Sequence, residues 1–170
     1  MNVKRITESN MTFVVDGDAT FEIEKADCIK RMQVVKIVEF VSLTGGYMVS
    51  MVEAKTSAPN PEGFEPTNFP VYIKDIIEKF QNSIALMNVA AIKRRKDIYD
   101  ILPITMQSFQ WAKAQYKLYL VIKNHRKEWL SPVSDALKKE MKPLLKCWGI
   151  PDSNLKVINE DIARERELID

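Results

Sequence analysis

Two adjacent β-prone segments constrain this chain more than any other feature of its sequence. Residues 34–43 and 47–55 are rich in Val, Ile, Phe and Met, and a Gly45-Gly46 pair lies between them. Apolar residues occupy both alternating faces of each segment, which is typical of strands buried on two sides rather than of a half-exposed hairpin. The pattern predicts two central antiparallel strands of a sheet that is covered on both faces.

Three charged side chains interrupt these apolar strands. Glu39 lies in the first strand, and Glu53 and Lys55 lie near the end of the second. Burying a carboxylate costs several kcal/mol, and two neighbouring carboxylates also repel each other. A divalent cation would offset both penalties, and a pair of carboxylates suits Mg²⁺ or Mn²⁺. The structural alternative is a salt bridge from Lys55 to Glu39 or Glu53 near the end of the sheet.

The length of the glycine loop decides whether the two carboxylates can meet. With a two-residue loop at Gly45-Gly46, Glu39 pairs opposite Val52 and faces away from Glu53. With a three-residue loop that also includes Tyr47, Glu39 pairs directly with Glu53 on one face. A shared metal ion requires the second register, so the sequence leaves the metal site dependent on the turn.

The rest of the chain alternates strand-like and helical patterns. Residues 12–15 and 20–24 flank the turn signal Asp16-Gly17-Asp18, which predicts an N-terminal hairpin. We interpret the remaining segments as a Pro- and Asn-rich loop at 56–70, a long helix at 71–91, a strand at 115–123, a helix from Ser131-Pro132 to Gly149 that Pro143 should kink or break, a strand at 155–158 and a helix at 160–169. Loops as long as 56–70 are often functional, so we expect it to border the site. The predicted fold is a single α/β domain over residues 1–170, with a central mixed β-sheet flanked by helices.

Two clusters of cations make nucleic acid a candidate partner, because the formal net charge of +2 is too small to indicate one. The first cluster follows the long helix and the second follows the strand at 115–123; their members are Lys93, Arg94, Arg95 and Lys96, and Lys123, Arg126 and Lys127. Such clusters can contact phosphates, although solvated helix ends have the same composition. The single histidine, His125, lies within the second cluster, and we expect it at the surface.

Composition excludes several classes of protein. Hydrophobic residues make up 46% of the chain and charged residues 28%, which is unlike disordered, collagen-like or coiled-coil sequences. The two cysteines are far apart, so we expect a reducing compartment, the cytoplasm, and no zinc site. No run of about 18 apolar residues is present, and we expect no membrane span. The oligomeric state stays open, and a homodimer is one of the alternatives.

The strand-borne acid, the turn and the Glu53-Ala54-Lys55 tripeptide together resemble the PD-(D/E)XK phosphodiesterase superfamily, whose fold many restriction endonucleases share. Members carry an acid at the end of one strand and (D/E)-x-K on the next. Glu39 matches the first acid, and Glu53 and Lys55 match the second motif. The family's usual first acid is Asp, often after Pro, whereas Glu39 follows Val38. The chain also resembles a group of small bacterial proteins with a strand-borne E-A-K and a Pro/Asn-rich loop, a likeness that implies no activity.

The resemblance implies a restriction-endonuclease-like fold and a metal-dependent nuclease acting on DNA or RNA. It assigns Mg²⁺ or Mn²⁺ to Glu39, Glu53 and the Ala54 carbonyl, and it gives Lys55 the task of positioning the attacking water. A further acid borne on a helix in the family would correspond to Glu22 or Glu24, which the sequence pattern places on a strand. The alternative is an interaction module that keeps the fold but lacks a working metal site.

Overall fold

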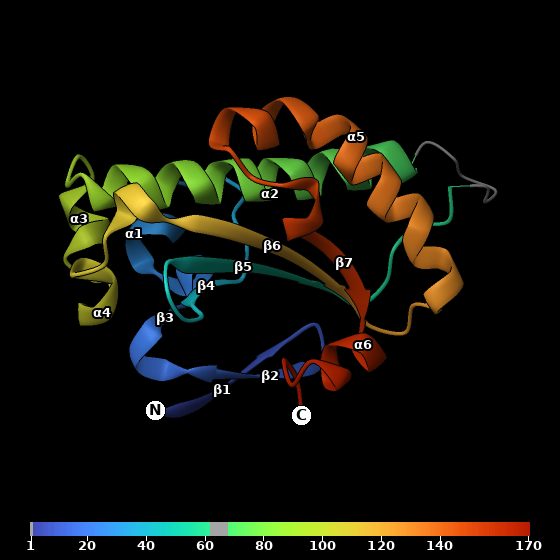
Figure 1. Cartoon of the computed structure of the whole chain (residues 1–170), viewed down its shortest axis with the longest axis horizontal. Helices are drawn as coiled ribbons and strands as arrows, with labels where there is room; N and C mark the ends of the chain where they lie inside the picture. The colour runs from blue at the N-terminus through green and yellow to red at the C-terminus, as the bar shows by residue number, and fades with distance from the viewer. Residues whose placement is uncertain (1, 62–67) are drawn as a thin grey trace.

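The computed structural model describes residues 2–61 and 68–170 and shows an α/β fold around a five-stranded mixed sheet (Figure 1). The strands, in their order across the sheet, are β3 (Thr20–Phe21), β4 (Phe40–Leu43), β5 (Met48–Lys55), β6 (Gln115–Ile122) and β7 (Leu155–Asn159). The β3–β4 and β4–β5 pairs are antiparallel, and the β5–β6 and β6–β7 pairs are parallel. The predicted fold class, a mixed sheet flanked by helices, is confirmed.

Two long helices cover one face of the sheet (Figure 1). α2 (Asn68–Ala91) links β5 to β6, and α5 (Leu130–Trp148) links β6 to β7. The apolar residues of α2 recur every three or four positions, so one stripe of the helix faces the core. The shorter helical elements are η1 (Gly17–Ala19), η2 (Ile23–Lys25), α1 (Asp27–Lys30), α3 (Lys96–Tyr99), α4 (Ile104–Gln107), η3 (Trp111–Lys113), η4 (Lys127–Trp129), η5 (Asp152–Asn154) and α6 (Glu160–Glu165).

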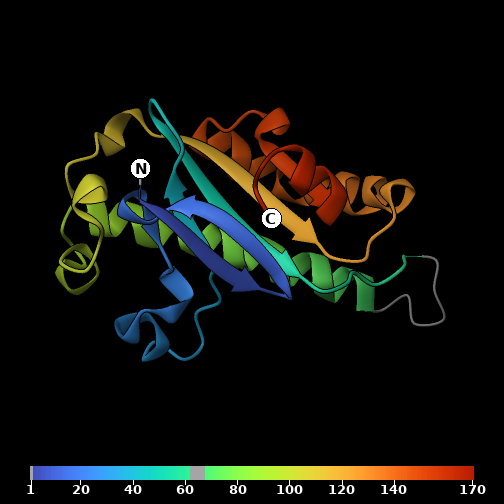
Figure 2. The same cartoon turned by 90° about the horizontal axis from the view of Figure 1, so that it is seen from below.

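A separate hairpin and α6 cover the opposite face. The hairpin consists of β1 (Val3–Glu8) and β2 (Met11–Asp16), and seen from below it lies across the strands of the main sheet (Figure 2). Phe13 of the hairpin packs edge-on against Phe40 of β4, with ring centroids 5.3 Å apart. Apolar side chains of β4, β5 and β6 therefore enter two cores, one on each face, as the two-sided apolar pattern predicts.

The predicted N-terminal hairpin is wrong in its pairing. β2 pairs with β1 through a tight turn at Ser9-Asn10, whereas residues 17–19 form a 3₁₀ turn that leads into β3. Ser9 and Asn10 have φ values of 49° and 58°, the left-handed conformation of a two-residue hairpin loop. The turn contains no glycine, so the usual sequence signal for this geometry is missing.

β4 is shorter than the predicted strand at 34–43. Polar side chains of α2 take the backbone groups that a longer strand would use: the Ser83 hydroxyl accepts from the Val38 N–H at 2.9 Å, and the Asn82 amide donates to the Lys36 carbonyl at 2.9 Å. The segment before β4 is thus attached to the helix rather than to the sheet.

Most of the C-terminal half follows the sequence pattern, although α6 ends at Glu165 and not at residue 169 as predicted. β6 and β7 match the predicted strands and are parallel, as the strand–helix–strand order predicts. α5 spans Leu130–Trp148 and is capped by Gly149, whose φ of 62° is left-handed. The expected break at Pro143 does not occur, because α5 continues through it to Trp148. None of the described helices is both long and apolar enough to cross a membrane.

Candidate functional site

The β4–β5 turn has the three-residue loop on which the metal hypothesis depends. Phe40 pairs with Val52, and the strands close at Thr44 and Met48, whose N–H and carbonyl groups are 3.1 Å apart. Glu39 directly precedes β4, and its backbone N–H donates to the Val52 carbonyl at 3.1 Å. The three-residue loop of the second predicted alternative therefore forms. The regular ladder ends at Phe40, and the charge of Glu53 acts on the Glu39 carboxyl group, so the two carboxyl groups are neighbours.

Glu53 and Lys55 share the face of β5 that α2 covers, and Ala54 faces the opposite core. The Glu53 side chain is fully buried, and its Oε1 lies 3.1 Å from Lys55 Nζ. Its second oxygen, Oε2, is buried with no hydrogen-bond partner among the described residues. Glu53 therefore has one oxygen in an ion pair and a second buried oxygen without a partner. Because an unpaired buried oxygen is unfavourable, this second oxygen is available to a further ligand.

α2 adds three polar side chains that the sequence analysis did not select. Lys79 Nζ lies 2.8 Å from Glu53 Oε1, and Lys55 Nζ lies 3.6 Å from Asp75 Oδ2. The Tyr72 hydroxyl is buried and has no hydrogen-bond partner in residues 2–61 and 68–170. Tyr72, Asp75 and Lys79 have the i, i+3, i+7 spacing of one helix face, so polar residues within the apolar helix pattern were the available signal.

A third acid reaches the site from the first part of the chain. Glu24 lies on η2, where its Oε1 is 3.9 Å from Lys79 Nζ and its carboxyl group is hydrogen-bonded to that of Glu39. The strand predicted at 20–24 is thus wrong beyond Phe21. Glu22, the other candidate, instead forms an ion pair with Lys25 at 2.7 Å.

Burial dominates the electrostatics of these acids. It raises the pKa of Glu39 to about 9, assisted by the hydrogen bond with Glu24 and the charge of Glu53. Burial also raises the pKa of Glu53, although Lys79 and Lys55 act against it. For Lys79, burial is the largest single influence and lowers the pKa, but the surrounding acids, Glu53 first, together outweigh it and the net shift is upward. Lys79 is therefore an ammonium ion, and Glu39 holds a proton at neutral pH that a bound cation could replace.

The Ala54 carbonyl is already in use. It accepts a hydrogen bond from the Ser9 hydroxyl, 3.0 Å away, at the turn of the β1–β2 hairpin. A carbonyl oxygen has two lone pairs, so one remains for another ligand.

The donor set fits a hard cation only in a limited way. Across residues 2–61 and 68–170, no three or more His, Cys, Asp or Glu side chains gather in a way that could hold a metal ion. The site offers a pair of interacting acids, Glu39 and Glu53, and Glu53 Oε2 has no hydrogen-bond partner in the part of the chain that the structure describes. Mg²⁺ is often held by one or two protein carboxylates and takes its other ligands from water and phosphate. The pair suits that mode and not a closed, all-protein cage.

A small cavity connects this cluster with solvent. It has a volume of about 240 Å³, and its lining includes Glu24, Lys36 and Lys79. Of the predicted loop at 56–70, residues 62–67 lie outside the described residues and Asn68–Pro70 belong to α2.

The first cationic cluster lies far from these carboxylates. α2 rises about 1.5 Å per residue, so its last residue, Ala91, is about 18 Å along the helix from Lys79, and the cluster follows it. Most of its members are engaged locally: Arg95 pairs with Asp97 at 2.8 Å, Lys96 pairs with Asp100 at 2.6 Å, and Lys93 Nζ lies 4.7 Å from the centre of the Tyr99 ring. Arg94 is exposed.

The second cluster begins directly after β6, at the end of the sheet where β5 also ends with Lys55. The Lys123 N–H donates to the Lys55 carbonyl at 2.8 Å, and Lys123 Nζ donates to the Asn10 carbonyl at 2.8 Å. Arg126 stacks over the Trp129 ring, 4.9 Å from its centre. These contacts bring the backbone of the second cluster, and not that of the first, to Lys55, while the Lys123 side chain reaches the turn of the β1–β2 hairpin.

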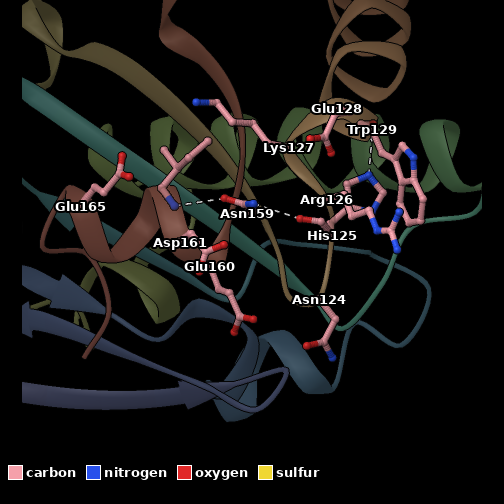
Figure 3. A pocket seen from close by; sticks show the side chains of 11 residues that line it. Asn124, His125, Arg126, Lys127, Glu128, Trp129, Asn159, Glu160, Asp161 and Glu165 are labelled. Carbon is pink, nitrogen blue, oxygen red and sulfur yellow. Dashed lines mark hydrogen bonds between the residues drawn. The ribbon is translucent and has the colours of Figure 1, made fainter.

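Figure 3 shows a pocket of about 750 Å³ at the ends of β6 and β7, beside the second cluster. Its lining mixes the cations Arg126 and Lys127 with the acids Glu128, Glu160, Asp161 and Glu165. His125 is only 8% exposed, so its predicted surface position is wrong. The His125 Nε2 lies 3.1 Å from the Trp129 carbonyl, and the Asn159 side-chain amide donates to the His125 backbone carbonyl at 2.9 Å. These contacts give His125 a structural role.

A scan of protein-family models and searches of curated proteins and of solved structures gave no match to this chain.

Proposed function

We propose that the protein is a metal-dependent phosphodiesterase, a nuclease acting on DNA or RNA, with a restriction-endonuclease-like fold. The observation that carries the proposal is the register of β4 and β5. It sets Phe40 opposite Val52, so that Glu39, directly before β4, is close enough to Glu53 for their carboxyl groups to interact. Lys55 shares the face of Glu53, whose Oε2 has no hydrogen-bond partner among the described residues. The alternative register would have separated the two carboxylates.

The chain's own residues would share the chemistry as follows. Glu39 and Glu53 would hold Mg²⁺ or Mn²⁺, with the Ala54 carbonyl as a third ligand through its free lone pair. When bound, the ion would polarise the scissile phosphate and lower the pKa of a water molecule. Glu39 must first lose the proton that its raised pKa retains. Lys55, 27% exposed, can orient a water molecule and neutralise charge on the phosphate oxygens.

The test is cleavage of single- and double-stranded DNA and RNA with and without Mg²⁺ or Mn²⁺. We expect Glu53→Gln and Lys55→Met each to reduce the rate about 10²- to 10³-fold, because each removes one preorganised charged group. The chain contains a second E-x-K tripeptide, Glu140 to Lys142, on the exposed side of α5. Glu140→Gln and Lys142→Met are therefore matched controls that should leave the rate unchanged.

Glu39→Asp distinguishes a working ligand from a remnant. If Glu39 holds the ion, shortening it by one methylene should move the ligand by about 1 Å and lower the activity. If Glu39 has lost this role, the change should be neutral or should improve metal binding, because Asp is the residue that the family resemblance leads us to expect there.

The second candidate is an interaction module without catalysis. The observation that favours it is the pairing of Glu53 Oε1 with both Lys55 and Lys79, which partly compensates the buried charge without a metal. A protein that binds no divalent cation at millimolar concentration and cleaves no nucleic acid would support this candidate over the nuclease.

Either candidate allows nucleic acid as a partner, and the second cationic cluster is the better placed. We expect Arg126→Ala or Lys127→Ala to weaken binding and to reduce its salt dependence by about one released ion each. Arg94→Ala, in the distant first cluster, should have less effect. The free thiols of Cys28 and Cys147 suit a reducing compartment, and we place the activity in the cytoplasm.

A further inference from the structure

Lys79 occupies an unusual position for a lysine. It lies between Ile76 and Phe80 on the inward side of α2, and its side chain is only 11% exposed. A buried ammonium is unfavourable unless acids surround it. Here its Nζ contacts Glu53 Oε1 at 2.8 Å and lies 3.9 Å from Glu24 Oε1.

This contact competes with any metal ion at the same carboxylate. A divalent cation held by Glu53 would lie within a few ångströms of the Lys79 ammonium, where two positive charges repel strongly at low dielectric. The ammonium also takes up one of the lone-pair directions that the ion would need. The two cations therefore exclude each other at Glu53 Oε1, and an ion on Oε2 of the same carboxylate would still lie within a few ångströms of the ammonium and be repelled by it.

The surroundings give a displaced Lys79 somewhere to go. The side chain lines the cavity of about 240 Å³ that opens beside the cluster, and Glu24 lines the same cavity. The Glu24 carboxylate is 46% exposed, so an ammonium that leaves Glu53 can pair with it in a hydrated position.

We propose that the Lys79 ammonium is the resident counter-cation of Glu53 and that a divalent cation must displace it toward Glu24 in order to bind. The inference rests on the proposed metal site and adds its regulation: Lys79 keeps the site closed to metal at low concentrations and sets the concentration at which the ion enters.

The first experiment measures Mn²⁺ binding by calorimetry to the wild type, Lys79→Met and Lys74→Met. Lys74 is an exposed lysine of the same helix, so its variant matches the change in charge and side chain. We expect Lys79→Met to bind Mn²⁺ about 10- to 100-fold more tightly than the wild type, the size of one lost charge-assisted hydrogen bond. Lys74→Met should bind like the wild type, and adding Glu53→Gln to Lys79→Met should abolish the gain.

The second experiment uses the wild type alone, in case Lys79→Met does not fold. Amine acetylation is followed residue by residue by mass spectrometry with and without saturating Mn²⁺. We expect labelling of Lys79 to rise several-fold on Mn²⁺ addition while that of Lys74 stays constant.

The outcomes separate this inference from the metal site itself. Equal Mn²⁺ affinity in the wild type and folded Lys79→Met, or unchanged Lys79 labelling in protein that binds Mn²⁺, would overturn the displacement and leave the metal site standing. Absence of Mn²⁺ binding in every variant and of any labelling response at millimolar Mn²⁺ would overturn both.

Discussion

Glu39 shows how a single residue links the register of the sheet to the chemistry of the site. Its neighbour Phe40 enters the core under the β1–β2 hairpin, so alternation turns Glu39 toward α2, where Glu53 and Glu24 lie. The sequence contained both carboxylates and the condition for their meeting. The sequence did not decide between the two turn lengths, because they differ by one residue and both accommodate Gly45 and Gly46.

The first prediction concerns stability and pH. The folded-state pKa of Glu39 is raised from its ordinary value to about 9, so the folded protein holds this proton more tightly than the unfolded chain does. The free energy of unfolding should therefore be highest below the ordinary carboxyl pKa and fall as the pH rises toward 9, with a slope approaching about 1.4 kcal/mol per pH unit. Glu39→Gln should remove most of this fall, as measured by urea unfolding at acidic, neutral and alkaline pH.

The control for this prediction is Glu140→Gln, which changes an exposed carboxylate on α5. It should reproduce the wild-type pH profile. At alkaline pH the Glu39→Gln protein should be more stable than the wild type, and a variant that loses stability there would contradict the assignment of the proton to Glu39.

The role of Lys79 could not be predicted from the sequence, for a physical reason. Its position on the helix surface is ambiguous, since it borders the apolar stripe of α2 and a long side chain there can also extend to solvent. Only the location of Glu53 on the facing strand makes the inward orientation favourable. The same holds for Tyr72, Asp75 and the contact of Glu24 with Lys79, because their roles also depend on partners distant in sequence.

At the scale of elements, the parts with strong local signals were predictable. β5, β6, β7 and the Gly149 cap of α5 match the sequence pattern because burial on both faces and a left-handed cap leave a clear local imprint. β1 was missed, since its turn at Ser9-Asn10 lacks glycine. The predicted strand at 34–43 is longer than β4 because side chains of α2, far away in sequence, form hydrogen bonds with the backbone of the segment before β4.

The second prediction concerns the two prolines of α5. Pro143 lies in the interior, where it removes a backbone hydrogen bond, whereas Pro132 lies in the first turn, where its N–H would have no partner in the helix. Pro143→Ala should raise the free energy of unfolding by about 1–3 kcal/mol, part of the interior cost being offset by the greater freedom of the unfolded chain. Pro132→Ala should be neutral or slightly destabilising. Chemical denaturation of both proteins measures the difference, and equal effects would show that the helix has adapted to Pro143.

At the scale of the whole molecule, the sheet is held between two unlike layers. α2 and α5 cover one face, and the β1–β2 hairpin with α6 covers the other (Figures 1 and 2). The two-sided apolar pattern of the central strands predicted that both faces are covered. It could not identify what covers the second face, because the hairpin forms its own two-stranded sheet and makes no strand pairing with the five-stranded one among the described residues.

The last prediction tests whether the hairpin layer and the main sheet unfold together as the single domain that the sequence predicts. Phe13 is almost fully buried against Phe40, so Phe13→Ala should lower the free energy of unfolding by about 3–5 kcal/mol. All three tryptophans, at positions 111, 129 and 148, lie outside the hairpin. Their fluorescence therefore reports on the rest of the molecule, whereas far-ultraviolet circular dichroism reports on every element. We expect both signals of Phe13→Ala to shift to the same lower denaturant midpoint, as cooperative unfolding requires. Tyr47→Ala, which truncates an aromatic ring that is 41% exposed, should shift the midpoint far less. A Phe13→Ala protein whose tryptophan transition stays at the wild-type midpoint, with an earlier transition in circular dichroism, would show instead that the hairpin is a separate unit laid over an independently stable sheet.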